Sequence, residues 1–339
     1  MKGKHHVVIE SPHLKYEFDI KRNITVILGD SATGKTTLID LINEVQRHGN
    51  ANRISIVSDV KCRVYSGDEN EWKLIFTNAE NTVFFIDEGY SFIFSKEFAE
   101  VISGTDNYYV LITRRPLPCL PYSINEIYGI RTSGKYHFPQ QVYHEFYPIY
   151  DSLRENFNAG PAFFITEDSK SGFQFVKACC GERIKCVSAE GNAGIFKLLV
   201  SAANETRTAV LADGAAFGAF VSKVLAYAET LDNIMLYLPE SFEWLVLRSG
   251  VITDGNLDKI LEHPEDYIDS RMYFSWERFF NDYLEKITAD DDIRKYRKQM
   301  LGQYYLEGKN RERIMMYFRN KFKNCCGKHD ECSAIHNHG

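Results

Sequence analysis

A run of residues from Gly29 to Thr36 has the types and the spacing needed to hold a chain of phosphate groups, because it fits G-x-x-x-x-G-K-[ST]. Glycines let the backbone fold into a nest of N–H donors, and a following helix directs its positive end at the β-phosphate. Lys35 would neutralise the β/γ charge and act in catalysis, and Thr37 would add a hydrogen bond to the α-phosphate. The residues expected to contact the nucleotide are Gly29, Asp30, Ser31, Ala32, Thr33, Gly34, Lys35, Thr36 and Thr37.

A second motif supplies carboxylates. Val83 to Glu88 reads as an apolar strand that ends in two acids, and we expect this strand to lie beside the strand that precedes Gly29. Asp87 would hold Mg²⁺ through water, together with the hydroxyl of Thr36. Glu88 would polarise the attacking water, which makes it the expected catalytic base. The alternative for Glu88 is a solvated acid at a strand end.

The elements that must position these residues follow from hydrophobic periodicity. A continuous apolar run predicts a buried parallel strand before Gly29, and a helix follows it. Alternating apolar and polar residues predict a further strand, 14–20, ahead of this buried strand and its helix. Residues 126 to 138 predict a hairpin around Thr132 to Lys135. The predicted strands of this half are 14–20, 24–28, 53–57, 61–65, 72–76, 82–86 and 108–113, and the predicted helix is 36–45.

These motifs resemble the ABC-class P-loop ATPases of the chromosome-maintenance and recombination lineage, within the wider AAA-type group. The resemblance covers roughly residues 5 to 140. It rests on an antiparallel hairpin ahead of the P-loop, on Asp87-Glu88, and on the next strand, which ends Ile112-Thr113-Arg114-Arg115. It implies ATP and Mg²⁺ as ligands. The serine-glycine-glycine signature of the family is missing between Thr36 and Val83, and Thr113 or Arg114 replaces its switch histidine, so the head-to-tail homodimer of that family is not implied and turnover would be slow or need a partner.

Other nucleotide-binding classes fit less well. The chain has no Asn-Lys-x-Asp motif for reading guanine, and Asp87-Glu88-Gly89 does not give the Asp-x-x-Gly switch of translational GTPases. Nucleoside kinases would carry an arginine-rich lid, for which Arg114 and Arg115 alone are weak support. ATP is therefore the expected nucleotide.

The second half predicts a smaller parallel sheet, since strands 162–166, 184–188, 208–211 and 233–237 alternate with helices 171–179, 193–203 and 217–231. Acids follow these strands at Glu167, Asp213 and Glu240, with Glu243 close behind, and such acids converge on one edge of a sheet. The pattern is similar to the Toprim fold, and the whole chain is similar to the overcoming-lysogenization-defect type of ATPase protein. That resemblance implies a second metal site at Glu167 and Asp213 for nuclease chemistry. Ala215 stands where the second aspartate is expected, and Glu240 or Glu243 could replace it as a ligand. The alternative is a non-catalytic domain in which Glu167, Asp168 and Ser169 cap a helix.

Near the C-terminus, soft ligands are grouped closely enough for a zinc site formed by Cys326, His329, Cys332 and His336. A disordered tail with adventitious metal affinity is the alternative. Trp276, Phe279, Phe280 and Tyr283 share one helix face, which indicates packing more than base stacking.

The predicted class is thus α/β: a P-loop NTPase domain with an antiparallel N-terminal hairpin (1–150), a Toprim-like parallel-sheet domain (160–250), a helical segment (251–324) and a Cys/His-rich tail (325–339). The net charge of -6 gives no bulk field for nucleic acid. No signal peptide or long apolar run is evident, which predicts a cytoplasmic protein without a membrane partner. The leading hypothesis is a slow Mg²⁺-dependent ATPase whose nucleotide state controls the second domain. An ATP-gated nuclease acting on nucleic acid and a non-hydrolysing switch that recruits a protein partner or forms a homodimer are the alternatives.

Overall fold

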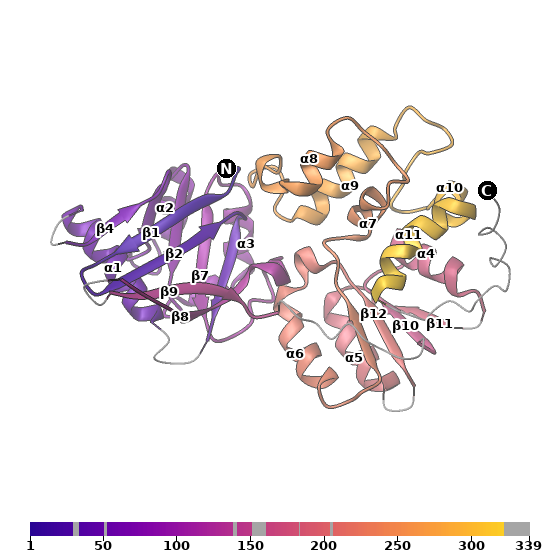
Figure 1. The fold of residues 1–339 in the computed structure, drawn as a ribbon, viewed down its shortest axis with the longest axis horizontal. Helices are drawn as coiled ribbons and strands as arrows, with labels where there is room; N and C mark the ends of the chain where they lie inside the picture. The colour runs from indigo at the N-terminus through magenta and orange to yellow at the C-terminus, as the bar shows by residue number, and fades with distance from the viewer. Residues whose placement is uncertain are drawn as a thin grey trace, which may run out of the picture. The chain divides into compact units, whose positions relative to one another are not determined.

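The computed structural model describes residues 1–29, 34–50, 53–137, 141–150, 161–182, 184–203 and 206–321. The chain forms two compact units (Figure 1). The first unit comprises Met1–Asp151, Asp213–Ser222 and Asp254–Tyr283. The second comprises Ser152–Ala212, Lys223–Thr253 and Leu284–Gly339. The helical region after residue 253 is therefore divided between the two units.

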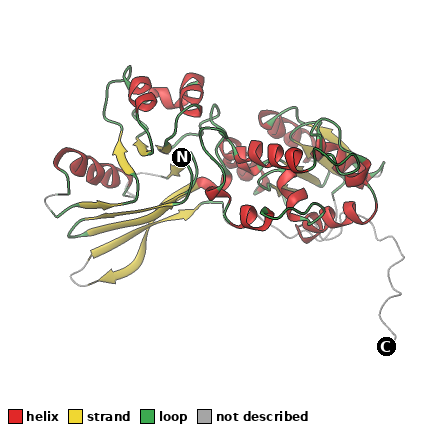
Figure 2. Cartoon of the chain, turned by 90° about the horizontal axis from the view of Figure 1, so that it is seen from above, coloured by secondary structure: helices red, strands yellow, loops and turns green. Residues whose placement is uncertain are grey.

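The first unit is built on one large mixed sheet, whose long strands are drawn in yellow in Figure 2. Within the described residues this sheet has nine strands in the order β4-β1-β2-β9-β8-β3-β7-β6-β5. The strands are β1 (His5–Glu10), β2 (Leu14–Ile20), β3 (Ile24–Leu28), β4 (Ser55–Val57), β5 (Lys61–Val64), β6 (Thr82–Ile86), β7 (Tyr108–Thr113), β8 (Ile127–His137) and β9 (Gln141–Pro148). Strands β3, β5, β6, β7 and β8 run parallel to their neighbours in this group. The predicted antiparallel N-terminal hairpin is confirmed as β1 and β2.

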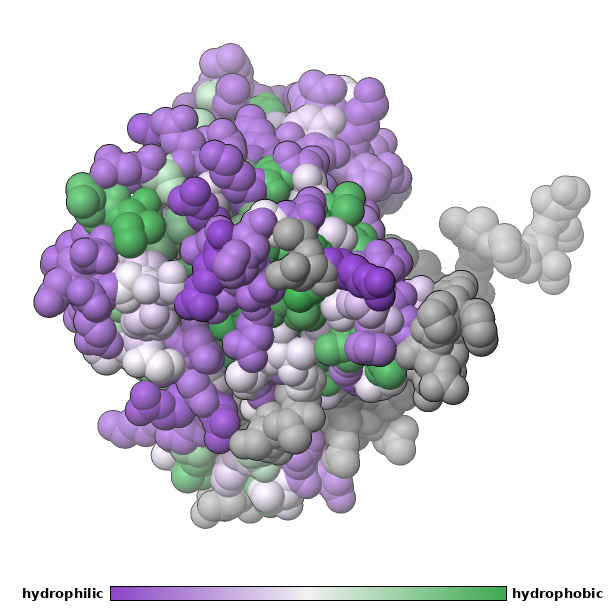
Figure 3. Space-filling model, turned by 90° about the vertical axis from the view of Figure 1, so that its left-hand side faces the viewer, coloured by the Kyte–Doolittle hydropathy of each residue, from purple (hydrophilic) through white to green (hydrophobic). Residues whose placement is uncertain are grey.

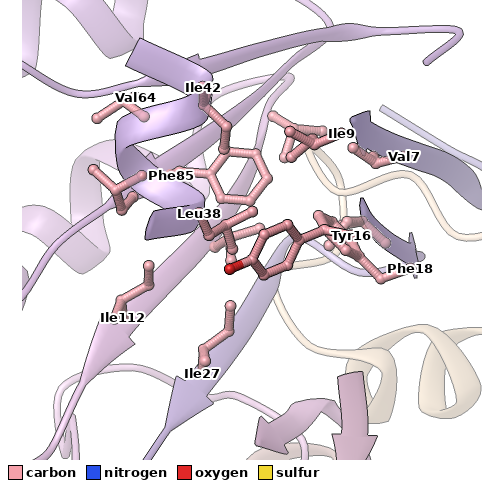
Figure 4. Close-up of a cluster of buried hydrophobic side chains, with 14 of the residues drawn as sticks. Val7, Ile9, Tyr16, Phe18, Ile27, Leu38, Ile42, Val64, Phe85 and Ile112 are labelled. Atoms are coloured by element: carbon pink, nitrogen blue, oxygen red, sulfur yellow. The ribbon is translucent and has the colours of Figure 1, made fainter. Parts of the chain in front are cut away.

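Helices cover both faces of this sheet, which explains why its central strands are continuously apolar. Helix α1 (Lys35–His48) packs on one face, where Leu38 and Ile42 share a buried cluster with Ile27 and Phe85 (Figure 4). The other face bears α2 (Trp72–Asn78), the short helix η1 (Ser91–Phe94) and α3 (Lys96–Ser103). Their aromatic rings surround Phe84 and Tyr109, which alternate along the strands with the residues beneath α1.

Two predicted elements of this unit are wrong. Residues 72–76 form the start of helix α2 and not a strand, because Trp72 and Phe76, four residues apart, lie on one helix face and are both buried against the sheet. The predicted turn at Thr132 to Lys135 is also absent. Strand β8 continues through it with a shift of register between Thr132 and Tyr136, so the serine-glycine signal marks a β-bulge.

The outer parts of the first unit are fastened to the start of β3. Arg22 lies over the Trp276 ring at 3.5 Å and pairs with the buried carboxylate of Glu126 at 3.2 Å. Asn23 donates from its side-chain amide to the Phe274 carbonyl at 2.9 Å. Trp276, Phe279 and Phe280 are buried, so this aromatic stripe packs the helix as predicted. Helices α8 (Leu257–Glu262) and the first part of α9 (Trp276–Ile287) belong to this unit.

The second unit has a smaller, fully parallel sheet. In the part of the chain that the structure describes it has four strands in the order β11-β10-β12-β13: β10 (Phe163–Thr166), β11 (Lys185–Ser188), β12 (Thr208–Leu211) and β13 (Ile234–Tyr237). Helices α4 (Ser171–Cys180), α5 (Asn192–Ala203), α6 (Gly218–Ala228) and α7 (Phe242–Arg248) alternate with or follow these strands, with η3 (Gly214–Ala216) between β12 and α6. Helices α10 (Gln303–Leu306) and α11 (Gly308–Lys321) come last. The short helices η2 (Ile124–Glu126) and η4 (Pro264–Asp266) complete the chain. The predicted α/β class is confirmed for both units.

Figure 3 shows a face of the molecule on which hydrophilic side chains predominate, with small green hydrophobic areas between them. Exposed apolar residues include Val57 and Leu74 of the first unit and Ile293 of the second. Single exposed apolar side chains of this kind are normal for a folded domain.

Candidate nucleotide-binding site

The core of the site is the passage from β3 to α1. β3 is buried up to Leu28, Gly29 follows with a φ of 146°, and α1 begins at Lys35 directly after Gly34. The amide of Leu38 donates to the Gly34 carbonyl at 2.9 Å, which closes the first helical turn. Asp30, Ser31, Ala32 and Thr33, the centre of the predicted phosphate loop, lie outside the described residues.

Gly34 is required at this position for two reasons. Its φ of 91° lies in the left-handed region, which costs an L-residue energy. A Cβ atom added here would also lie 2.8 Å from the hydroxyl oxygen of Tyr16, closer than real contacts allow. The same Tyr16 hydroxyl donates to the Gly34 carbonyl at 2.9 Å. A strand of the sheet therefore fixes the glycine from which the helix starts.

Lys35 is buried, with 9% of its surface exposed, and its ammonium donates to the Gly29 carbonyl. The contact joins the residue before the undescribed segment to the first residue of α1. A buried lysine is unusual unless it has partners, which makes its placement informative.

The two threonines after Lys35 occupy the first turn of α1. Thr36 is exposed at the surface of this turn, and Thr37 is half-buried. Tyr16 makes a side-chain hydrogen bond with Thr37, while burial raises the pKa of the Tyr16 phenol to about 12. Thr36 is open to solvent, as a hydroxyl that reaches a hydrated metal ion would need to be.

The acids of the second motif lie at the end of β6, but this strand is not the neighbour of β3. Strand β7 lies between them, which corrects the predicted arrangement. The reason is that Tyr108 to Thr113 is as apolar as the other two strands and is buried along its whole length, so it fits the centre of the sheet. With strands about 4.8 Å apart, the ends of β3 and β6 are about 10 Å apart.

Alternation along β6 puts Asp87 on the α1 side of the sheet. Val83 and Phe85 pack beneath α1, and side chains two residues apart share a face, so Asp87 belongs to the α1 side of the sheet. Its Oδ1 atom accepts a hydrogen bond from the Glu88 amide at 2.8 Å, which orients the carboxylate. Asp87 is half-buried.

Glu88 is engaged by a residue that follows β7. Its Oε1 atom lies 3.1 Å from the Nε atom of Arg114, with the side chains of Glu88 and Arg114 37% and 53% exposed. An ion pair this exposed contributes little to stability. It does hold the Glu88 carboxylate against a guanidinium.

Sequence reasoning missed two residues of the site. Tyr16 belongs to β2 and His144 to β9, and these strands pair with Tyr16 opposite His144. The two rings stack with their centroids 4.7 Å apart and their planes 14° from parallel. Burial lowers the pKa of His144. Alternation predicts β2, but no local signal in Gln141–Pro148 indicates that β9 lies against β2 and beside the phosphate loop.

The acids predicted for a second metal site lie in different parts of the structure. Glu167 directly follows β10 in the second unit, where its amide donates to the Leu211 carbonyl at 3.1 Å. Asp213 follows β12 and belongs to the first unit. Glu240 is half-buried between β13 and α7. Asp168 accepts a hydrogen bond from the amide of Lys170 at 2.9 Å. Lys170 itself is the N-cap of α4, and no side chain makes the capping hydrogen bond there, so the predicted capping by Glu167, Asp168 and Ser169 is wrong.

Glu243, the reserve ligand, has a structural role within the second unit. Its carboxylate is fully buried, accepts a 2.6 Å hydrogen bond from the Tyr296 hydroxyl and a 3.2 Å bond from the Ser171 hydroxyl, and lies 3.8 Å from the Lys298 ammonium. It thereby fastens the starts of α4 and α7 to the chain that follows α9.

The zinc ligands predicted at Cys326, His329, Cys332 and His336 lie outside the described residues. Among the residues that are described, no group of three or more His, Cys, Asp or Glu side chains is arranged to hold a metal ion. Within the same residues, no helix combines the length and the apolar character that crossing a bilayer requires.

Comparison with known proteins gave no match: no protein-family model, no curated protein and no solved structure resembles this chain significantly. The geometry of the site therefore carries the functional argument.

Proposed function

We propose that the first unit binds ATP together with Mg²⁺ and hydrolyses it slowly. The observation that carries the proposal is the closed passage from β3 to α1, in which the buried Lys35 ammonium returns to the Gly29 carbonyl and Gly34 begins the helix in a left-handed conformation. Helix N-termini preceded by a glycine-rich loop are anion sites. Gly34 has no Cβ atom and is held by Tyr16, which fits the close approach of such a loop's backbone to phosphate.

The donor set on the α1 side of the sheet fits Mg²⁺. Thr36 provides a hydroxyl and Asp87 an oriented carboxylate, the hard oxygen ligands that this ion prefers. Because β7 lies between the two strands, we assign Asp87 an outer-shell role, in which it would hold the metal through water. When bound, Mg²⁺ would neutralise charge on the β- and γ-phosphates.

Hydrolysis requires a base, and we assign that role to Glu88. In the described structure its carboxylate faces Arg114. We infer that Glu88 acts on water only after Arg114 is drawn away, and the γ-phosphate offers Arg114 a stronger partner because phosphate binds a guanidinium through two oxygens. This ordering favours slow turnover.

Phosphate release and nucleotide binding, measured separately, test the proposal. The wild-type protein is expected to bind Mg²⁺-ATP and to release phosphate. Glu88→Gln is expected to bind ATP with unchanged affinity and to lose hydrolysis by about a hundredfold or more, as removal of a general base does. Asp87→Asn is expected to weaken binding only when Mg²⁺ is present. If wild-type protein binds no ATP at millimolar concentration, the proposal is wrong.

A non-hydrolysing ATP switch is the second candidate, and the Glu88–Arg114 pair is the observation that favours it, since it occupies the base. Phosphate release that equals the rate in buffer, together with tight ATP binding, would select this function. The partner of such a switch would be a protein or a second copy of the chain.

Nuclease action by the second unit has narrower support. The parallel sheet is of the kind in which acids after the strands meet a ligand, and Glu167 is placed there. Glu243 is already committed to Tyr296 and Ser171. An ATP-gated, Toprim-like nuclease therefore remains an alternative proposal, for which metal-dependent cleavage of nucleic acid that is lost in Asp213→Ala would be the decisive result.

A further inference from the structure

His144 has a polar atom that nothing in the described structure satisfies. Its Nδ1 atom is buried and makes no hydrogen bond within the residues described, although the ring as a whole is only half-buried. Buried polar atoms are nearly always paired, so each exception calls for an explanation. The packing of the ring does not provide one, because stacking on Tyr16 uses the ring face and leaves the nitrogen without a partner.

The edge of the ring that carries Nδ1 lies beside Gly34, where α1 begins. A Cβ atom built on Gly34 would lie 3.6 Å from Cε1 and 3.7 Å from Nδ1 of His144. The stacked Tyr16 bonds to the Gly34 carbonyl at 2.9 Å and to the side chain of Thr37. His144 is thus placed at the end of the loop where α1 begins, on the side of Thr37.

The direction identifies the part of a nucleotide that Nδ1 would meet. Lys35 serves the β- and γ-phosphates, and Thr37 is the residue expected at the α-phosphate. A neutral imidazole carries one N–H, and burial favours the neutral ring by lowering the pKa of His144. A phosphate oxygen is an acceptor, so it would satisfy an Nδ1–H group at this place.

We propose that His144 contacts the bound nucleotide and that its Nδ1–H group donates a hydrogen bond to an oxygen of the α-phosphate. This inference rests on the proposed ATP binding and adds to it a phosphate contact from β9, a strand outside the phosphate loop and the acidic motif. It assigns the unpaired nitrogen a ligand.

The test is the affinity of wild-type and variant proteins for ATP, ADP and inorganic pyrophosphate, measured by calorimetry. His144→Phe keeps the ring that stacks on Tyr16 and removes the donor. It is expected to weaken ATP and ADP binding by the same factor, roughly ten- to hundredfold, the worth of a hydrogen bond to a charged acceptor. Pyrophosphate, which has no α-phosphate attached to a nucleoside and is held through Lys35, is expected to bind as in wild type.

Two further variants separate the donor from the fold. His144→Asn keeps an N–H donor close to the place of Nδ1 and is expected to restore most of the lost affinity. His6→Phe removes a histidine from β1 of the same sheet, one whose exposed ring bonds to Asp19, and is expected to leave nucleotide binding unchanged.

Each outcome decides the inference. If wild-type protein binds ADP and His144→Phe binds it equally well, the contact does not exist, while the proposed ATP binding stands. If His144→Asn is as weak as His144→Phe, or if pyrophosphate binding falls in parallel, His144 shapes the site through packing and the inference fails. If wild-type protein binds no nucleotide, the proposed function itself is refuted.

Discussion

Replacing Gly34 by alanine tests how the sheet fixes the start of α1. Two costs are expected. The backbone at Gly34 has a φ of 91°, which costs an alanine about 1–2 kcal/mol. The new Cβ would also lie 2.8 Å from the Tyr16 hydroxyl, and such overpacking costs about 1–3 kcal/mol. The free energy of unfolding of the first unit should therefore fall by about 2–5 kcal/mol in Gly34→Ala.

A matched glycine and a double mutant separate the two costs. Gly3 of the same unit has a φ of 92°, but the nearest atom to its added Cβ is 4.0 Å away. Gly3→Ala should therefore lose only the backbone contribution of about 1–2 kcal/mol. Tyr16→Phe removes the hydroxyl and its bond to the Gly34 carbonyl, at a cost of about 1 kcal/mol. In Gly34→Ala/Tyr16→Phe the clash is gone, so the loss should be smaller than the sum of the two single losses by about 1–3 kcal/mol.

Urea unfolding followed by tryptophan fluorescence measures these values. Trp72 and Trp276 belong to the first unit and Trp244 to the second, so a Trp244→Phe background reports on the first unit. Additive losses in the double mutant, within about 0.5 kcal/mol, would refute the contact between Tyr16 and the position of the Gly34 side chain. Equal losses in Gly34→Ala and Gly3→Ala would refute it as well.

Other predictions concern buried charges and thiols. Arg22→Ala should destabilise the first unit by about 1–3 kcal/mol, since the buried Glu126 carboxylate loses its nearer cation and keeps Lys21 at 3.6 Å, and Arg22→Lys should recover part of that loss in the same urea assay. Glu243→Ala should cost the second unit about 2–4 kcal/mol, because the Tyr296 and Ser171 hydroxyls lose their acceptor; a loss below 1 kcal/mol, read from Trp244 fluorescence, would contradict the structural role of this acid. Iodoacetamide at pH 8 should modify Cys186 well before Cys62. Burial raises the pKa of Cys62 to about 11, which leaves about a thousandth of it as thiolate, whereas a hydrogen bond from Cys180 lowers the pKa of Cys186. Mass spectrometry measures the labelling of each cysteine over time. Faster labelling of Cys62 than of Cys186 would contradict this prediction.

Local patterns predict those parts of the fold that depend on local physics. The buried strands before Gly29 and Asp87 are continuous apolar runs because helices cover them on both faces, and both appear as predicted. The β/α alternation of the second unit appears for the same reason. Trp72 to Phe76 was predicted as a strand because a short apolar run fits either period, and only the packing of both rings on one face selects the helix.

Long-range pairing is what the sequence does not reveal. Nothing near Thr82 to Ile86 indicates that β7 is inserted next to β3, and that insertion decides how far Asp87 lies from Thr36. Likewise, the pairing of β2 with β9 brings His144 beside Gly34 across a large separation in sequence. Motif spacing found the residues that lie next to each other in the chain, Gly34 to Thr37 and Asp87 with Glu88, and missed those that the sheet brings to them.

The central claim is that Lys35 and the loop that it closes bind the terminal phosphates of ATP. Calorimetric titration of Mg²⁺-ATP into wild-type protein and into Lys35→Ala, with circular dichroism to show that both are folded, tests it most directly. Because the ammonium would bond to charged phosphate oxygens, we expect the dissociation constant for ATP to be larger in Lys35→Ala than in wild type by roughly a hundredfold or more. Equal affinity of the two proteins for ATP would contradict the claim.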